Sequence, residues 1–224
     1  MKLKKLFNIF LIISLLPLIS CKAGLVAEEA APSISSTDKI LLLPFKNMAK
    51  IYGENVSVRC PVCGKVIMVG KVVPGVERDL TEKTFALLTE EKNIHLIPPS
   101  QAEGALSGLM LRDKTSRPQL DVILEAGRKM DADAVIYGYV YRYQERVGTT
   151  YAIDSPASVA FDIHLIRTSD GSLIWNGHFD ETQQSLSENL LKLRTFIKRK
   201  AKWVSAGEMA EAGIEEVLKT FPES

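Results

Sequence analysis

Apolar runs predict the strands of the first half of the chain. Residues 38–45 (DKILLLPF) are apolar up to Pro44, as in a strand that is covered on both faces. Residues 93–99 (NIHLIPP) predict a shorter strand, which two prolines stop because proline lacks the backbone N–H that a sheet ladder needs. These two strands therefore flank the helix that the pattern predicts at 77–91.

The second half of the chain predicts longer strands. Residues 131–148 begin apolar on both faces, and four tyrosines then share one side, which indicates a half-buried sheet surface (Tyr137, Tyr139, Tyr141 and Tyr143). Residues 158–182 predict a hairpin, because apolar residues alternate with Asp162 and His164 before a turn at 169–172. On this pattern His164 points away from the apolar stripe, and we expect a partly exposed histidine.

Apolar residues at helical spacing predict five helices. The helix at 77–91 carries Leu80, Leu87 and Leu88 on one face and charged residues on the other. Two of the other helices begin at predicted capping boxes, Ser100 with Glu103 and Ser116 with Gln119. The last two begin near Ser185 to Glu188 and near Ser205 to Glu208. The last two helices lie within 185–222 and close the chain.

The order of these elements predicts an α/β fold. Its mixed sheet is sandwiched by helices, with parallel strands first and an antiparallel meander last. Residues 52–75 interrupt the order with a segment (SVRCPVCGKVIMVGKVV) that predicts two short strands around a CPVCG turn. We interpret this segment as an inserted hairpin within a domain that covers 38–224.

The first residues predict export and lipid anchoring. Residues 1–20 have a basic start and an apolar stretch too short for a membrane span, as in a cleaved signal peptide. Leu18, Ile19 and Ser20 precede Cys21 as in a bacterial lipobox, so we expect acyl chains on Cys21. Residues 21–37 lack periodic hydrophobicity and predict a flexible tether. Because Lys22, and not aspartate, follows Cys21, we expect the outer membrane, facing the periplasm.

The charge of the chain argues against one class of partner. The formal net charge is +1, and cleavage of the signal peptide removes Lys2, Lys4 and Lys5 from this balance. A nucleic-acid-binding protein would need a basic surface to neutralise phosphates. We therefore expect no nucleic-acid partner.

Cys60 and Cys63, in the CPVCG turn, allow three readings. An oxidising periplasm favours a local disulfide between them. A tight turn with two converging thiolates also suits zinc, for which His95, His164, His178, acidic groups or a second subunit would supply the remaining ligands. A thiol-redox role is the third reading, although strand-like residues follow the pair where a redox motif would open a helix.

Other polar residues carry weaker signals. Asp162, His164 and Asp170 could form part of a hydrolytic triad, but the chain contains no nucleophile elbow, metalloprotease motif or phosphate-binding loop. We therefore predict no catalytic residues. The densest basic run is either a solvated helix end or an interaction site for a lipid or an acidic partner (Lys198, Arg199, Lys200 and Lys202, beside Trp203).

Taken together, these patterns resemble a known family of domains. The opening strand ILLLPF, the helix leading into DADAVIYGYV, and the hairpin turn in SDGSLIW are similar to the periplasmic α/β domain of the TolB N-terminal kind. That domain also occurs in bacterial lipoproteins such as CsgG, PelC and LpoB. The resemblance implies a non-enzymatic accessory or assembly protein of export or cell-wall machinery, which acts by self-association or by docking to an envelope complex. The alternative is a metal-binding or thiol-redox lipoprotein acting through Cys60 and Cys63.

Overall fold

The structure is a computed structural model, which describes residues 34–35, 38–92, 94–112, 119–148, 153–183 and 204–222. The signal peptide, Cys21 and nearly all of the tether lie outside the described residues. So do the helix predicted from Ser185 and the basic run from Lys198 to Trp203. In the part of the chain that is described, no helix is both long and apolar enough to span a membrane.

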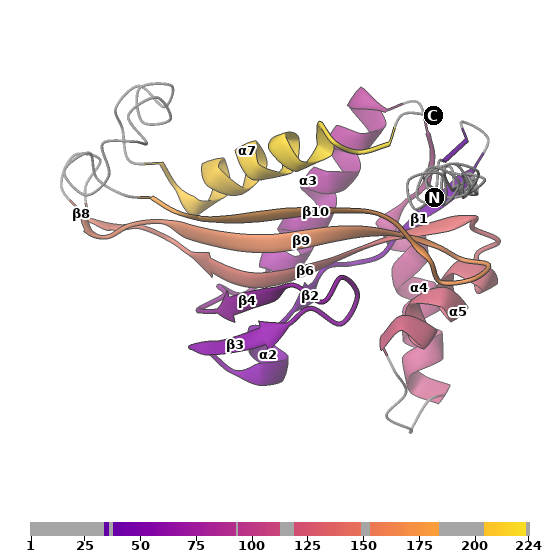
Figure 1. The fold of residues 1–224 in the computed structure, drawn as a ribbon, viewed down its shortest axis with the longest axis horizontal. Coiled ribbons are helices and arrows are strands. Elements are labelled where there is room, and N and C mark those ends of the chain that lie inside the picture. The colour runs from indigo at the N-terminus through magenta and orange to yellow at the C-terminus, as the bar shows by residue number, and fades with distance from the viewer. Residues whose placement is uncertain are drawn as a thin grey trace, which may run out of the picture. The chain divides into compact units, whose positions relative to one another are not determined.

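A mixed sheet forms the centre of the domain (Figure 1), and the prediction of parallel strands followed by an antiparallel meander is confirmed. Strand β1 (Lys39–Leu42) lies between β5 (His95–Ile97) and β6 (Ala134–Gln144) and runs parallel to both. Strand β9 (Ser158–Arg167) pairs antiparallel with β6, and β10 (Leu173–Thr182) pairs antiparallel with β9. A short strand, β2 (Lys46–Asn47), also pairs with β6.

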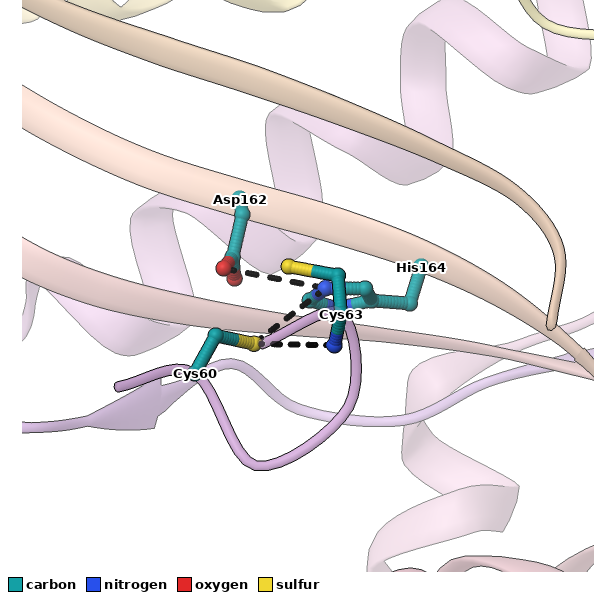
Figure 2. Close-up of side chains that lie close together, drawn as sticks. All are labelled: Cys60, Cys63, Asp162 and His164. Atoms are coloured by element: carbon teal, nitrogen blue, oxygen red, sulfur yellow. Dashed lines mark hydrogen bonds and ion pairs between the residues drawn. The ribbon is translucent and has the colours of Figure 1, made fainter. Parts of the chain in front are cut away.

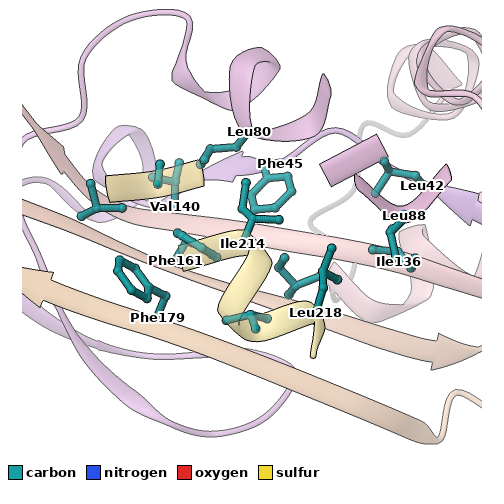
Figure 3. Close-up of a cluster of buried hydrophobic side chains, with 14 of the residues drawn as sticks. Leu42, Phe45, Leu80, Leu88, Ile136, Val140, Phe161, Phe179, Ile214 and Leu218 are labelled. Atoms are coloured by element: carbon teal, nitrogen blue, oxygen red, sulfur yellow. The ribbon is translucent and has the colours of Figure 1, made fainter. Parts of the chain in front are cut away.

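One face of the sheet is covered by two helices (Figure 3). Helices α3 (Val76–Glu91) and α7 (Ala206–Leu218) contribute Leu80, Leu88, Ile214 and Leu218 to a core shared with Ile136 and Phe161 of the sheet. These apolar side chains are fully buried, and burial of this kind is the main favourable contribution to folding. The predicted start of α7 near Ser205 is confirmed, and Ser205 and Glu208 form a capping box there.

The other face of the sheet has a separate core. It is covered by α5 (Gln119–Lys129), by Ala102 of α4 (Pro99–Arg112), and by the segment around α2 (Ala49–Tyr52). Helix α4 begins at Pro99, so the predicted start at Ser100 is one residue late. Proline suits this position because the first helical residues have no intrahelical partner for their N–H groups.

The predicted hairpin around CPVCG packs on this second face. Strands β3 (Val56–Arg59) and β4 (Val66–Val69) pair antiparallel and bury Val58, Ile67 and Val69 against the sheet. Residues after β4 run along β6, since Gly70 N–H donates to Tyr141 O and Tyr143 N–H donates to Lys71 O. The sheet therefore holds the hairpin at its base. That the hairpin is an insertion relative to similar proteins stays a prediction.

A second small antiparallel pair joins β7 (Val147–Gly148) to β8 (Ile153–Ser155). Together with β2 and α2 it was not predicted, because elements of two to four residues are too short to show periodicity.

The tyrosine row differs from the prediction. All four rings are buried, each with at most 4% of its surface exposed, so they form core and not a half-buried surface. A register shift between Val140 and Arg142 also places Tyr143 in the core under α3 and α7, whereas Tyr137, Tyr139 and Tyr141 lie on the hairpin side. A β-bulge has this effect because one extra residue reverses the alternation of side chains.

A candidate metal centre under the hairpin

Four potential metal ligands meet between the hairpin and the sheet. The two sulfurs of Cys60 and Cys63, a carboxylate oxygen of Asp162 and a ring nitrogen of His164 all lie within 4.8 Å of one another. Figure 2 shows the two cysteines on the turn of the hairpin and the other two side chains on the strand behind it. Cys60, Asp162 and His164 are buried, and Cys63 is partly exposed. Burying polar groups without a partner is energetically costly, so a buried cluster of this kind is a candidate binding site.

The turn positions its two sulfurs through backbone hydrogen bonds. Gly64 N–H donates to Cys60 O at 3.0 Å, and Cys63 N–H donates to the sulfur of Cys60 at 3.5 Å. Gly64 has a φ of 75°, a conformation that glycine adopts without steric cost. The side chain of Arg59 closes the turn by donating to Gly64 O. We call residues 60–64 the knuckle.

Strand β9 supplies the other two candidate ligands. Asp162 and His164 are two residues apart and therefore project from the same face of the strand, toward the hairpin. His164 is fully buried, so the expectation of a partly exposed strand histidine is wrong. The alternation was read correctly, but the hairpin covers the face of the sheet that the sequence pattern alone left open to solvent.

Hydrogen bonding fixes the orientation of His164. Its Nδ1 lies 3.2 Å from Tyr137 O, and a carbonyl oxygen can only accept, so Nδ1 carries a proton. Its Nε2 then faces the cluster, 3.4 Å from the sulfur of Cys60 and 3.6 Å from Oδ2 of Asp162. A backbone carbonyl behind the ring is the usual arrangement of a metal-ligating histidine.

The two oxygens of Asp162 differ in their surroundings. Oδ2 accepts a hydrogen bond of 2.7 Å from the hydroxyl of Tyr141. Oδ1 is buried and has no hydrogen-bond partner. An orphaned carboxylate oxygen in a buried site is unfavourable by itself, and a cation would satisfy it.

The cluster also shifts the protonation of its members. Burial lowers the pKa of His164, but hydrogen bonds with Cys60 and Cys63 and the charge of Asp162 outweigh it and raise this pKa to about 10. The hydrogen bond with His164 is the main reason why the pKa of Cys63 is lowered. Burial raises the pKa of Asp162. Without a metal, the site therefore keeps protons that balance its negative groups.

The spacing of the four ligand atoms is compatible with a tetrahedral zinc ion. With zinc bonds of about 2.3 Å to sulfur and about 2.0–2.1 Å to nitrogen or oxygen, neighbouring ligand atoms lie about 3.3–3.8 Å apart. The distance of 3.4 Å between Nε2 of His164 and the sulfur of Cys60 falls in this range. Two thiolates, one imidazole and one carboxylate are also ligand types that zinc accepts. Four protein ligands would leave no open position, as in a structural zinc site.

The other readings of the cysteine pair fare differently. Cys60 and Cys63 are free thiols in the structure. They are only three positions apart in the chain, so a disulfide between them stays a prediction. The residues that follow the pair form β4, and not a helix whose N-terminus would activate a thiol.

The remaining predicted residues are dispersed. Asp170 lies exposed in the turn between β9 and β10, where it accepts from Ser172 N–H, so the structure does not bring it to Asp162 and His164. His95 is exposed in β5. His178 lies in β10, directly opposite Asp162 in the ladder. The pKa of His178 is lowered, mainly because the ring is partly buried.

The residues that support the cluster were not predicted. Tyr137 O and the hydroxyl of Tyr141 hold His164 and Asp162, whereas the sequence pattern indicated only a possible triad member at Asp162 and sheet surface at the tyrosines. The available signal was alternation, which places Tyr137 and Tyr141 on the same face of the sheet as the two β9 residues. The pairing of Tyr137 with His164 in the ladder was not visible in the sequence.

Comparison with known proteins gives a fold and no family. Neither the models of known protein families nor the curated proteins yield a match to this sequence. Among solved structures, a variant of the PelC dodecamer from Paraburkholderia phytofirmans matches with a TM-score of 0.51 and 14% identity, over 87% of this chain and 95% of that chain. A second structure of this dodecamer has a TM-score of 0.48 and 14% identity, over 87% and 94% of the two chains.

A further match is more distant. The C-terminal domain of LpoB from Salmonella enterica has a TM-score of 0.41 and 16% identity, over 68% of this chain and 88% of that chain. At these identities a likeness concerns the fold alone. The mixed α/β domain of this chain is similar in fold to PelC.

Proposed function

We propose that this chain is a zinc-binding, non-enzymatic accessory protein of the bacterial cell envelope. It is anchored through acyl chains on Cys21 and faces the periplasm from the outer membrane. In this proposal one zinc ion, held by Cys60, Cys63, Asp162 and His164, fastens the hairpin to the sheet. The ion is structural, so the protein acts by presenting a folded surface and not by catalysis.

One observation carries the metal part of the proposal. Ligand atoms from two segments about a hundred residues apart converge within 4.8 Å, and three of the four side chains are buried. A disulfide between the cysteines alone would not involve the buried carboxylate of Asp162 or the imidazole of His164. Zinc uses all four groups, and its charge offsets the negative charge that burial otherwise makes costly.

The envelope part of the proposal rests on other support. The lipobox at Cys21 predicts the anchor, and the likeness to the fold of a dodecameric protein is compatible with self-association. Fold alone does not determine function, so the partner is left to experiment. If crosslinking in intact cells recovered neither a second copy nor an envelope protein, the accessory role would be wrong.

Zinc analysis tests the proposed centre. The full lipoprotein, purified in detergent without chelator, is analysed for metal content, and its reactive thiols are counted before and after chelation under nitrogen. We expect one zinc per chain and two thiols that react only after the metal is removed. The variant with Cys60→Ser and Cys63→Ser should contain no zinc.

Matched variants show whether a loss of zinc is specific to the proposed ligands. His164→Gln should lose zinc, whereas His95→Gln, at an exposed position, should keep it. A chain with neither zinc nor reactive thiols would show that the disulfide is correct and that the proposal is wrong. One zinc per two chains would show a shared ion and would also overturn the site within one chain.

A further inference from the structure

His178 borders the candidate centre without belonging to it. It is paired directly with Asp162 in the antiparallel ladder of β9 and β10, so both side chains project from the same face of the sheet. Directly opposite residues have Cβ atoms only about 4.5–5.5 Å apart. The four-residue cluster does not include His178, and this ring is partly exposed where Asp162 is buried.

Two unsatisfied atoms face this boundary. Oδ1 of Asp162 and Nδ1 of His178 are both buried and both lack a hydrogen-bond partner. Asp162 is only 1% exposed, so its orphaned oxygen has no access to bulk solvent. Buried polar atoms of this kind normally have partners. Because they belong to directly opposite residues on one face of the sheet, a small polar species or a cation bound beside the two side chains could satisfy both.

The surroundings of His178 connect the surface to the knuckle. The charges of Lys65, Asp180 and His164 all act on His178. Lys65 directly follows the knuckle, and Asp180 is exposed in β10. His178 therefore lies between the solvent-exposed edge of β10 and the buried cluster.

We infer that His178 and Oδ1 of Asp162 form a transit site through which a divalent metal ion reaches the four-ligand centre and leaves it. This inference rests on the proposed function. The ion binds first to the imidazole of His178 and to Asp162. It then moves to the sulfurs and to Nε2 of His164, while protons on these groups pass to solvent. Asp162 stays bound throughout, and His178 is released.

Such a role has a distinct kinetic signature. A residue that acts only along the route changes the rates of metal uptake and release by the same factor, so the equilibrium affinity is unchanged. A resident ligand, in contrast, changes affinity, stoichiometry and the spectrum of the bound ion. Substitution of a residue with only a structural role in β10 has no specific effect on the rates of metal uptake and release.

The test uses Co²⁺, whose visible absorption reports a tetrahedral site with thiolate ligands. The purified lipoprotein is freed of metal, Co²⁺ uptake is followed by stopped-flow absorption, and release is followed after excess chelator is added. We expect His178→Gln to slow uptake and release by the same factor, whereas loss of a residue that supports the bound ion would lower its affinity by about 10–100-fold. The stoichiometry and the spectrum should stay the same, and His178→Glu, which keeps a ligand atom, should restore the rates.

The controls separate this inference from the proposed function. Unmodified protein that binds no Co²⁺ or Zn²⁺ while its thiols are reduced would contradict the proposed function itself. If the unmodified protein binds one ion but His178→Gln leaves the rates at the level of His95→Gln, only the transit site is wrong. An altered spectrum in His178→Gln would also overturn it, because His178 would then be a resident ligand.

Discussion

At the scale of single residues, the central feature is Asp162. Its carboxylate is 1% exposed, one of its oxygens has no partner, and burial raises its pKa. A buried carboxylate of this kind weakens the metal-free protein, since its charge is costly inside the domain. With zinc bound, the same charge becomes a ligand. Asp162 should therefore destabilise the metal-free protein and stabilise the zinc-bound protein.

Asp162→Asn tests this reversal, because it removes the charge and keeps the shape. We expect the variant to bind zinc at least about tenfold more weakly, which is the usual size of an affinity loss at a perturbed metal site. Competition with a chromophoric chelator measures this affinity. The metal-free variant should be at least as stable to urea as the metal-free parent. Asp121→Asn, at an exposed position of α5, serves as the control. Unchanged zinc affinity in Asp162→Asn would remove the carboxylate from the ligand set.

At the scale of elements, the hairpin is held at its two ends in different ways. At its base, backbone hydrogen bonds tie residues 70–73 to β6, and Arg142 donates to Met68 O. At its tip, the knuckle contacts the sheet through Cys60, which lies 3.4 Å from His164, and through apolar packing of Val62 and Cys63. Zinc would therefore matter most at the tip. The two sheet faces have separate cores, so the helical face should not depend on the metal.

Hydrogen exchange after metal removal tests this division. Chelation should raise exchange at the amides of Cys60 and Gly64, which bond within the turn, by about tenfold or more, because the tip would open without unfolding the domain. Amides of α7 should keep their protection and serve as the internal control. Equal protection of the tip with and without metal would show that zinc does not hold the hairpin.

Most elements were predictable because their signals are local. The apolar run of β1, the alternation of β9 and the start of α7 all appear within a few residues, and the structure confirms these elements. The exposure of His164 was not predictable, because alternation shows which residues share a face and not what covers it. The β-bulge that turns Tyr143 to the other face likewise depends on pairing with β9.

At the scale of the whole molecule, the site is a product of tertiary contact. Cys60 and His164 are 104 positions apart, and only the packing of the hairpin on the sheet brings them together. The sequence predicts that a histidine or an acidic group could complete the cysteine pair, but it offers three histidines without a means of choosing among them, and the structure places His164 and Asp162 beside the pair. The fold is similar to that of PelC, and the proposed zinc centre is argued from this chain's own residues.

X-ray absorption at the zinc edge, measured on the purified protein, reports which atoms surround a bound ion. We expect two sulfur ligands at about 2.3 Å and two nitrogen or oxygen ligands at about 2.0–2.1 Å around one ion per chain. Four sulfur ligands would mean that two hairpins share the ion, and a protein without bound metal whose cysteines are oxidised would mean that the pair is a disulfide. Either result would contradict a zinc centre built by Cys60, Cys63, Asp162 and His164 of one chain.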